Sequence, residues 1–509
     1  MSQSQNLFAC LTQSALSSRL PYTLLPSSFL LLTFLVVGCR TNKDILNDYE
    51  KALLAGDYSG PVAEIEERAE DGGVDELLWW LHAGGSRYLM NDYPVSVEHF
   101  DRAEDIFLKN DRTSVFEQGA VGAFAMVSND RAFPFAGGGE DRIFACFYKA
   151  VDYMRNGNSA AARTELNRAA QHQDNWLWER KKEIADAAEK LKKDSDAYAK
   201  KEGGASSASG ADTAKSEQAV NAAFADASFA SQVSANCNFN MATDGNTETL
   251  ARKDWLNRYV QYVTALFRIL SGDGDGAGYL RELADIDPAN PLIKSDLQLA
   301  VSGAKPRDVA WVFVEDGLGP VREEWRLDLP IVLIPYANRY VLYAGMALPY
   351  LRQRGAAFGS YSVSAGGSSS PLVEVQDVDR LIKTEFDVYF RGALIREITR
   401  TVVKVGVQVA LGVLADTVSD NYTRIALRAS QAAAAVWAAS VTQADLRNWS
   451  GLPKRVLAMR INRPTDGKVT ISGDGTPVAE VNLPAGNSLV FVRKTSSIAP
   501  AVVKTATFP

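Results

Sequence analysis

A recurring pair of helical segments is the feature of this chain that most constrains its fold. Residues 77–107 combine a segment rich in aromatic residues and glycine, a short polar turn, and a second segment with small residues at helical spacing. The small residues Gly84 and Ala103 are 19 positions apart, and Ala150 and Ala169 repeat that spacing further along. We therefore predict two helical hairpins of the same kind, each closed by a tight contact at its small residues.

The spacing of these residues resembles the tetratricopeptide repeat. Two weaker copies flank the first two, at residues 49–69 and 259–288. Because a single repeat cannot bury its own apolar face, the repeats are expected to stack into a right-handed solenoid with a concave surface. The alternative is a set of unrelated helical hairpins whose small residues match by accident.

After Gly303 the pattern changes to short apolar runs separated by glycine-rich turns. Strands are predicted at 309–314, 331–335, 373–375, 455–461, 468–471, 478–481 and 489–492. Residues 379–420 are predicted to form a long helix or a broken pair of helices, and 422–441 another helix. Residues 342–353 fit either a helix or a strand, and the Gly/Ser-rich stretch 355–370 is expected to be a mobile loop. The apolar run 405–414 is too short to cross a bilayer and is expected to lie in a buried helix.

The predicted fold class is therefore α+β, with an all-α tetratricopeptide-like solenoid followed by a C-terminal α+β domain that has a mostly antiparallel sheet. The expected division is a signal peptide at 1–38, helical repeats at 39–202, a flexible linker at 203–250, a further repeat at 251–302, and the C-terminal domain at 303–509. The linker rests on composition, since 203–211 reads GGASSASGA.

The N-terminal region carries an apolar run, Phe29–Cys39, that ends in Val-Val-Gly-Cys. The wider hydrophobic segment, Leu24 to Val37, is interrupted by Pro26 and is shorter than the roughly 20 residues of a membrane-spanning helix. A small residue followed by cysteine is typical of a bacterial lipoprotein signal, so Cys39 is predicted to be lipidated, with Arg40 favouring the periplasmic face of the outer membrane. The alternative is an ordinary secretory peptide with a chance cysteine.

Composition limits the partners and the redox chemistry. The formal net charge is −7, which argues against nucleic acid, because phosphate binding relies on an excess of Lys and Arg. Downstream of Cys39 only Cys146 and Cys237 remain. Export permits a disulfide between them, but Cys146 lies in an apolar helical pattern, which favours a buried free thiol.

No catalytic, metal or cofactor motif stands out. The three histidines, His82, His99 and His172, fall in the predicted repeats and are expected to be solvated. The sequence contains no HExxH, GxSxG or P-loop pattern. The run 272–278, GDGDGAG, lacks the lysine of a P-loop and the closing glutamate of an EF-hand, so we interpret it as a turn between helices. No cofactor and no metal are predicted.

Three stretches, 129–140, 315–320 and 445–453, together resemble a family of uncharacterised bacterial lipoproteins. They contain Asn129-Asp130, Pro134-Phe135 and Glu140; Glu315-Asp316-Gly317-Leu318-Gly319-Pro320; and Asp445-Leu446-Arg447-Asn448-Trp449-Ser450-Gly451-Leu452-Pro453. Members combine tetratricopeptide-like helices with a distinctive C-terminal domain. The resemblance implies an address and an architecture, and no established activity.

Six residues are candidates for binding: Glu315, Asp316, Arg400, Asp445, Arg447 and Trp449. On a strand the first two point to opposite sides, so they are poorly placed as a shared acid/base pair. The two arginines and Asp445 either frame a polar groove or tie a helix to a loop. Trp449 is expected to be a hydrophobic plug, with an exposed partner-binding aromatic as the alternative.

These observations predict a lipid-anchored periplasmic scaffold or adaptor that binds envelope protein partners through its helical repeats, without covalent chemistry. One alternative is an envelope enzyme that acts on cell-wall glycan or peptide, with acidic residues near Glu315 and Asp445 in a cleft. The other is a subunit of a secretion or pilus apparatus.

Overall fold

The computed structural model describes residues 41–112, 129–201, 209–335 and 339–508. The chain divides into an N-terminal unit, residues 1–46, and a second unit, 47–509, which holds the features described below. The predicted signal peptide and Cys39 lie outside the described residues. One helix in the described part, α16 (Val378–Thr417), is long and apolar enough to cross a membrane, and 56% of its most apolar window is buried.

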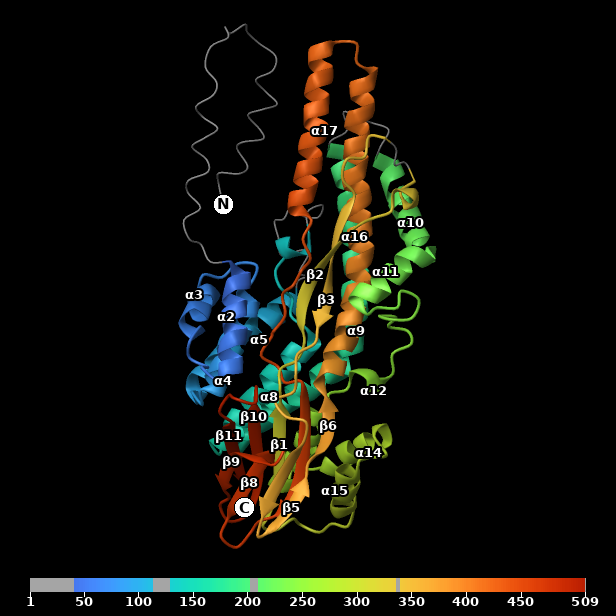
Figure 1. Ribbon diagram of the computed structural model, residues 1–509. Coiled ribbons are helices and arrows are strands. Elements are labelled where there is room, and N and C mark those ends of the chain that lie inside the picture. The colour runs from blue at the N-terminus through green and yellow to red at the C-terminus, as the bar shows by residue number, and fades with distance from the viewer. Residues whose placement is uncertain (1–40, 113–128, 202–208, 336–338, 509) are drawn as a thin grey trace. The chain divides into compact units, whose positions relative to one another are not determined.

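The protein is α+β, as the sequence predicts, with 54% helix and 18% strand. Helices dominate the N-terminal half, and the strands follow (Figure 1). The first helices are α2 (Asn42–Ala55), α3 (Val62–Glu70), α4 (Glu76–Leu89), α5 (Tyr93–Arg112), α8 (Gly139–Arg155) and α9 (Ser159–Lys201). The next are α10 (Ser209–Ala225), α11 (Ala227–Cys237), α12 (Arg252–Trp255), α13 (Arg258–Ser271), α14 (Gly276–Ile286) and α15 (Pro291–Val301).

The predicted hairpins form at α4–α5 and α8–α9, where the small residues allow close packing. A Cβ on Gly84 would lie 2.8 Å from the Phe100 ring of the facing helix, so only glycine fits there without a shift. Ala103, Ala150 and Ala169 are fully buried. The run 272–278 is the turn between α13 and α14, with Asp275 capping α14.

The strands form three sheets. They are β1 (Val309–Asp316), β2 (Val321–Asp328), β3 (Gly345–Arg352), β4 (Tyr361–Ala365), β5 (Ser368–Pro371), β6 (Val373–Asp377), β7 (Arg455–Asn462), β8 (Lys468–Gly473), β9 (Thr476–Asn482), β10 (Asn487–Lys494) and β11 (Val502–Phe508). A five-stranded sheet has the order β11-β10-β1-β7-β6, a four-stranded sheet has the order β5-β4-β8-β9, and β2 pairs with β3. All pairs are antiparallel except β1 with β10.

The five-stranded sheet is covered on both faces, which is why β1 and β10 are almost wholly buried. On one face Phe313 stacks on Phe491 at 5.7 Å between ring centres, and Phe147 of α8 and Tyr259 of α13 pack against these rings. On the other face Val312 and its neighbours share a core with the four-stranded sheet. Helices α8 and α13 and the four-stranded sheet therefore cover the large sheet from opposite sides.

The structure differs from the flexible linker predicted at 203–250. Within the described part of that stretch, α10 and α11 form, and Phe229, Val233 and Phe239 are fully buried. They share a core with Phe386 and Phe390 of α16 (Val378–Thr417). This stretch is rich in Ala, Ser and Asn, so its few well-spaced apolar residues did not indicate helices in the sequence analysis.

Other local expectations met a mixed outcome. The predicted strand at 331–335 begins instead with a 3-10 turn, η2 (Ile331–Leu333), which directly follows Pro330. The expected mobile loop at 355–370 contains the β4–β5 hairpin, because β4 pairs with β8 far along the chain. Within the stretch 342–353, residues 345–352 form β3. The stretch 379–420 forms the single helix α16, which ends at Thr417, and α17 (Asn421–Val441) follows it. Cys146 and Cys237 are free and buried, as expected.

Candidate functional site

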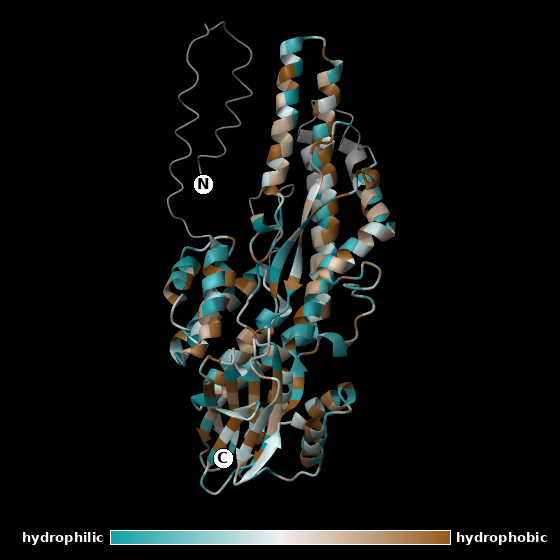
Figure 2. Cartoon of the chain, in the orientation of Figure 1, coloured by the Kyte–Doolittle hydropathy of each residue, from teal (hydrophilic) through white to brown (hydrophobic). Residues whose placement is uncertain are grey.

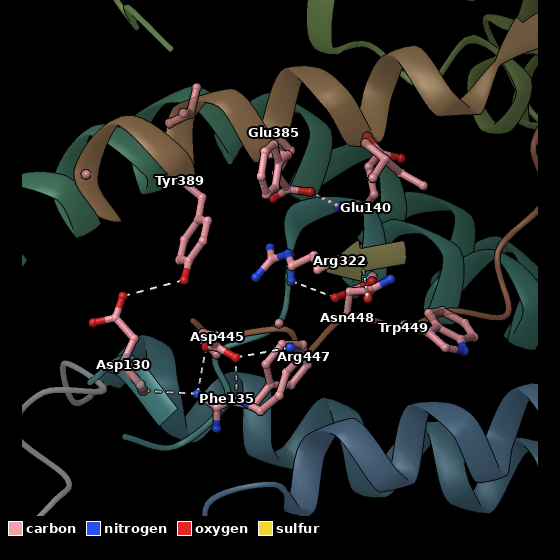
Figure 3. A pocket seen from close by; sticks show the side chains of 18 of the residues that line it. Asp130, Phe135, Glu140, Arg322, Glu385, Tyr389, Asp445, Arg447, Asn448 and Trp449 are labelled. Carbon is pink, nitrogen blue, oxygen red and sulfur yellow. Dashed lines mark hydrogen bonds and ion pairs between the residues drawn. The ribbon is translucent and has the colours of Figure 1, made fainter. Parts of the chain in front are cut away.

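A cavity of about 140 Å³ lies where distant parts of the chain meet (Figure 3). Its walls come from residues 130–141 at the start of α8, from the first half of α16, from residues 445–452, and from single residues of α9, β2 and β3, namely Arg180, Arg322 and Leu351. Several lining side chains, among them Glu385 and Tyr389, keep partial solvent exposure. This is the place where three of the predicted binding residues, Asp445, Arg447 and Trp449, come together.

Asp130 ties the loop before α8 to helix α16. Its carboxylate accepts hydrogen bonds from Arg396 (2.7 Å) and from Arg400 (2.6 Å), one helical turn apart on α16. Burial alone raises the pKa of Asp130, but the two guanidinium charges hold it well below its usual range. Arg400 is 1% exposed and stands behind the cavity wall rather than in it. Arg400 therefore ties helix to loop, which was one of the two predicted roles.

Arg447 joins three segments at the base of the cavity. Its guanidinium donates to both carboxylate oxygens of Asp445 at 2.8 Å, to Asp75 at 2.9 Å, and to the carbonyl oxygen of Phe133 at 2.9 Å. Such bidentate pairs are the strong form of the arginine–carboxylate contact. The pKa of Asp445 is lowered, because Arg447 outweighs the effect of burial. Asp445 and Arg447 therefore line the cavity, and Arg447 also holds together the segments that form it.

Trp449 is a plug, as predicted. It is 3% exposed, and its ring centre lies 5.7 Å from Phe100 and 6.0 Å from Tyr148. A Cβ on Gly85 would lie 3.2 Å from the Trp449 indole, so the lack of a side chain at Gly85 lets the indole pack closely against α4. Its edge forms part of the cavity wall.

Glu315 and Asp316 lie outside the cavity, on opposite faces of β1. Glu315 accepts hydrogen bonds from Tyr259 (3.0 Å) and Tyr148 (3.2 Å) of the repeat helices. Asp316 accepts from the Tyr361 hydroxyl at 2.8 Å and from Arg455 at 2.9 Å. The predicted opposite orientation is confirmed. Both carboxylates join the large sheet to the layers that cover it, and neither shares a pocket with Asp445.

Glu385 of α16, which the sequence did not single out, caps the first turn of α8. It accepts hydrogen bonds from the backbone N–H groups of Gly139 (2.5 Å) and Glu140 (3.2 Å) and from the indole N–H of Trp176 (3.4 Å), and the Arg180 guanidinium lies 3.9 Å away. Gly139 has no room for a side chain, since a Cβ would collide with the ring of Trp176. The signal for this contact was Gly137-Gly138-Gly139 before two acids, but its partner lies 246 residues away.

Two acids at the start of α8 have no ion-pair partner among the described residues. Glu140 accepts from Asn257 at 2.9 Å, and Asp141 accepts from the backbone N–H of Gly138 at 2.7 Å. Burial, followed by the charge of Glu385, raises the pKa of Glu140 well above its usual range and the pKa of Asp141 to about 7. At neutral pH this end of the cavity therefore holds partly protonated acids.

Arg322 was also missed. Its backbone N–H is held by Asn448 at 3.3 Å, and its guanidinium lies over the rings of Tyr389 (4.4 Å) and Phe386 (5.6 Å). Figure 3 shows this side chain reaching into the space between Tyr389, Glu385 and Asp445. Within the described parts of the chain its guanidinium makes no hydrogen bond or ion pair.

The prediction of solvated histidines is wrong for two of them. His82 is fully buried, with Nδ1 2.7 Å from the Leu78 carbonyl oxygen and Nε2 3.1 Å from Ser450 Oγ. Burial lowers the pKa of His82 to about 4. His99 is 9% exposed and lies 2.8 Å from Glu66. His82 is buried because residues 449–451 pack against α4, and His99 of α5 is buried against Trp80, with 5.1 Å between the ring centres. No group of His, Cys, Asp and Glu side chains suited to a metal ion occurs in the described residues.

No protein-family model, curated protein or solved structure matches this chain. The three stretches that carry the resemblance to bacterial lipoproteins nevertheless meet in space. Gly319 donates its backbone N–H to the Leu452 carbonyl oxygen at 2.9 Å, Asn448 donates to Pro320 at 3.3 Å, and Arg447 reaches Phe133. Two of these stretches, 129–140 and 445–453, line the cavity, and the third, 315–320, contacts residues 448 and 452 from outside it.

Proposed function

We propose that the protein is a lipid-anchored periplasmic adaptor of the cell envelope, which binds a helical partner protein through α17 and performs no covalent chemistry. The observation that carries this proposal is an apolar stripe on α17 that is exposed to solvent. The lipid anchor at Cys39 and the location at the periplasmic face of the outer membrane rest on the sequence.

The repeat helices support a scaffold role more than a docking role. In α4, 12 of 14 residues are buried, and in α8 the number is 15 of 17. The surface that a solenoid would offer to a partner is occupied by the chain's own large sheet, where β11 and β10 pack against α8. A partner therefore needs another surface, and the α16–α17 hairpin offers one.

The exposed stripe on α17 consists of Tyr422, Ile425, Ala429, Ala432 and Val436. Tyr422 is 82% exposed, Ile425 68% and Val436 71%, and the two alanines are exposed as well. The steps between these positions are three, four, three and four, the spacing with which one helix packs along another in a coiled coil. Figure 2 shows the pale, alanine-rich body of this helix beside the more hydrophobic α16. Small residues at its centre permit a close approach.

The opposite side of α17 is firmly attached. Gln431 donates to the Tyr340 carbonyl oxygen at 2.6 Å, and Lys404 of α16 donates to Thr442 at 3.1 Å. The only buried residues of α17 are Gln431, Ala435 and Ala438, which all face the rest of the protein. The stripe is therefore held on a supported surface, which lowers the cost of ordering it on binding.

The charge of α17 indicates the chemistry of the partner. Between residues 421 and 441 the helix contains Arg424 and Arg428 and no acidic residue. Arg428 is paired with Asp416, while Arg424 donates hydrogen bonds to Asn421 and to the Val418 carbonyl oxygen and interacts electrostatically with Asp420 at the helix N-terminus. An amphipathic helix with acidic residues beside its apolar face would complement this surface.

The test uses crosslinking in intact cells, with the native signal sequence, followed by identification of what is captured. Four proteins are compared: wild type, Val436→Glu, Val301→Glu and Cys39→Ala. Val301 is a matched control, since it is an exposed valine (60%) at the end of α15. We expect one stoichiometric envelope partner that is retained by Val301→Glu, lost by Val436→Glu and reduced by Cys39→Ala.

Equal capture by Val436→Glu and wild type would overturn docking on α17. Capture of a second copy of this chain, confirmed by sedimentation of the purified protein, would replace the adaptor with a self-assembling subunit such as that of a secretion or pilus apparatus. The alternative of an envelope enzyme remains a separate hypothesis, to be tested by offering cell-wall fragments to the purified protein and looking for products.

A further inference from the structure

The charged groups around the cavity are paired, with three exceptions. Asp130 is matched by Arg396 and Arg400, Asp445 is matched by Arg447, and Glu385 is near Arg180. The groups without an ion-pair partner in the described structure are one guanidinium, that of Arg322, and two carboxyl groups, those of Glu140 and Asp141. All three line the cavity.

An unpaired guanidinium at a half-buried position is costly, because its five N–H donors have lost part of their water. The rings of Tyr389 and Phe386 offset this cost only in part and leave the N–H groups at the guanidinium edge without acceptors. A carboxylate is the group whose two oxygens match that edge.

Asp141 shows the reverse deficit. One of its oxygens accepts from Gly138, while the other has no hydrogen bond in the described structure. Its raised pKa has a geometric cause, since it is 8% exposed, faces Glu385, and has no cation within ion-pair distance. An ammonium group beside Asp141 would supply the missing charge.

We propose that the cavity binds a free α-amino acid with an apolar side chain, whose carboxylate pairs with Arg322 and whose ammonium group pairs with Asp141. The two groups that the site lacks carry opposite charges, and an α-amino acid carries both on one carbon. Arg322 and Asp141 are near enough to influence each other electrostatically. This site is separate from the α17 stripe, so it does not rest on the proposed adaptor function.

The size and the remaining walls fit the side chain of such a ligand. A dry cavity of about 150 Å³ is known to hold a molecule of benzene, so 140 Å³ accommodates a ligand the size of leucine and excludes a folded peptide. Phe135, Leu351, Ile382 and Leu452 form apolar parts of the wall. Apolar lining with a few convergent polar groups is the usual form of a small-molecule site.

The experiment is isothermal titration calorimetry on the full chain with Cys39→Ala, so that no lipid is attached. The probes are L-leucine, D-leucine, 4-methylpentanoate, which lacks the ammonium group, and 3-methylbutylamine, which lacks the carboxylate. Each probe is titrated into wild type, Arg322→Met and Asp141→Asn. Two exposed residues of β2 provide matched controls, Arg326→Met and Asp328→Asn.

We expect leucine of one hand to bind and both truncated analogues to bind at least about tenfold more weakly, because each loses one charge-assisted contact. Arg322→Met and Asp141→Asn should each weaken leucine by about ten- to a hundredfold, and the two controls should leave it unchanged. Circular dichroism checks that the variants fold. For a variant that does not fold, Arg322→Lys or Asp141→Ser takes its place.

The pH dependence separates this proposal from a site for anions alone. Asp141 is faced by Glu140 on its own helix, Glu385 on α16, Arg180 on α9 and Arg322 on β2. Pairing with an ammonium group requires the charged carboxylate, so leucine should bind more weakly as the pH falls below about 7. Tighter binding at lower pH, binding of 4-methylpentanoate equal to that of leucine, or no binding of any probe would overturn the proposal.

Discussion

Two sets of buried acids in this protein differ in how completely they are partnered. Glu315, 2% exposed, receives hydrogen bonds from Tyr148 and Tyr259 and lies 3.7 Å from Arg493. Asp141, 8% exposed, has one backbone hydrogen bond and no ion pair among the described residues. Buried polar groups normally have hydrogen-bond partners, so the surroundings of Glu315 are explained by the fold alone. Asp141 has only one such partner in the described parts of the chain, which points to a ligand that the fold itself does not supply.

The comparison also applies to two arginines. Arg493 donates to the carbonyl oxygens of Gly317 (2.6 Å), Gly451 (3.1 Å) and Glu315 (3.2 Å), and joins β10 to two loops. Arg322 rests on two aromatic rings and donates nothing from its guanidinium within the described structure. If Glu315 and Arg493 serve the fold whereas Asp141 and Arg322 serve a ligand, substituting the first pair should lower stability. Substituting the second pair should weaken ligand binding.

The largest effect is expected from Glu315→Ala. Removing this carboxylate leaves Arg493 buried and two tyrosine hydroxyls without acceptors, so the free energy of unfolding should fall by about 3–5 kcal/mol. Urea denaturation followed by circular dichroism measures it. Glu480→Ala, at an exposed position of β9, is the control and should change stability by less than about 0.5 kcal/mol. A similar, small effect for both variants would show that the Glu315 network does not hold the layers together.

The next effect is the pH dependence of stability that Asp141 contributes. Its pKa is about 7 in the folded state against an ordinary value of 3.8, so between these values the folded protein binds more protons than the unfolded chain. Stability from this group is therefore fully present below about pH 4 and declines as the pH rises, by up to about 1.4 kcal/mol per pH unit.

Asp141→Asn should abolish that contribution. The unfolding free energy of the wild type should fall relative to that of the variant as the pH of the urea titrations rises from about 5 to about 7.5. A difference that does not change with pH would mean that Asp141 is charged in the fold and already has a partner.

A smaller effect is expected from Arg322→Met. The substitution loses only the contact with the two rings, so the free energy of unfolding should fall by about 1 kcal/mol or less. Arg493→Met is the comparison and should cost about 3–5 kcal/mol, because it leaves the buried Glu315 carboxylate without its cation. Thermal and urea unfolding of both variants give the ranking. Equal losses would remove the distinction between the two arginines.

The smallest effect on stability is expected from Val436→Glu. The side chain is 71% exposed and contributes little to the core, so unfolding should change by less than about 0.5 kcal/mol. A clear loss of partner capture combined with unchanged unfolding would mark α17 as a binding surface. A destabilisation of several kcal/mol would instead show that the stripe is covered within this protein.

Much of the fold could be predicted from the sequence because the decisive signals were local. The spacing of small residues located α4–α5 and α8–α9, and apolar runs located β1, β7, β8, β9 and β10. The prediction failed for strands whose hydrogen-bonding partner lies far away in the sequence. The β4–β5 hairpin depends on β8, more than 100 residues later, and β11 carried too weak a pattern to stand out.

The candidate site could be predicted only in part. Asp445, Arg447 and Trp449 were singled out because unusual residues cluster there, and all three line the cavity. Arg322 and Glu385 look like ordinary surface residues of a strand and a helix. Nothing in their own neighbourhood shows that one would lack a partner, or that the other would cap a helix 246 residues away.

The sequence by itself therefore determined the fold class, the helical hairpins, four of the five strands of the large sheet (β1, β6, β7 and β10) and the opposite orientation of Glu315 and Asp316, since these follow from periodicity and from backbone geometry. The tertiary structure alone decided which charges meet. Asp130 pairs with Arg396 across 266 positions, and His82 meets Ser450 across 368. Such contacts depend on how completed elements pack, because burial and partner choice are properties of layers brought together rather than of any one segment.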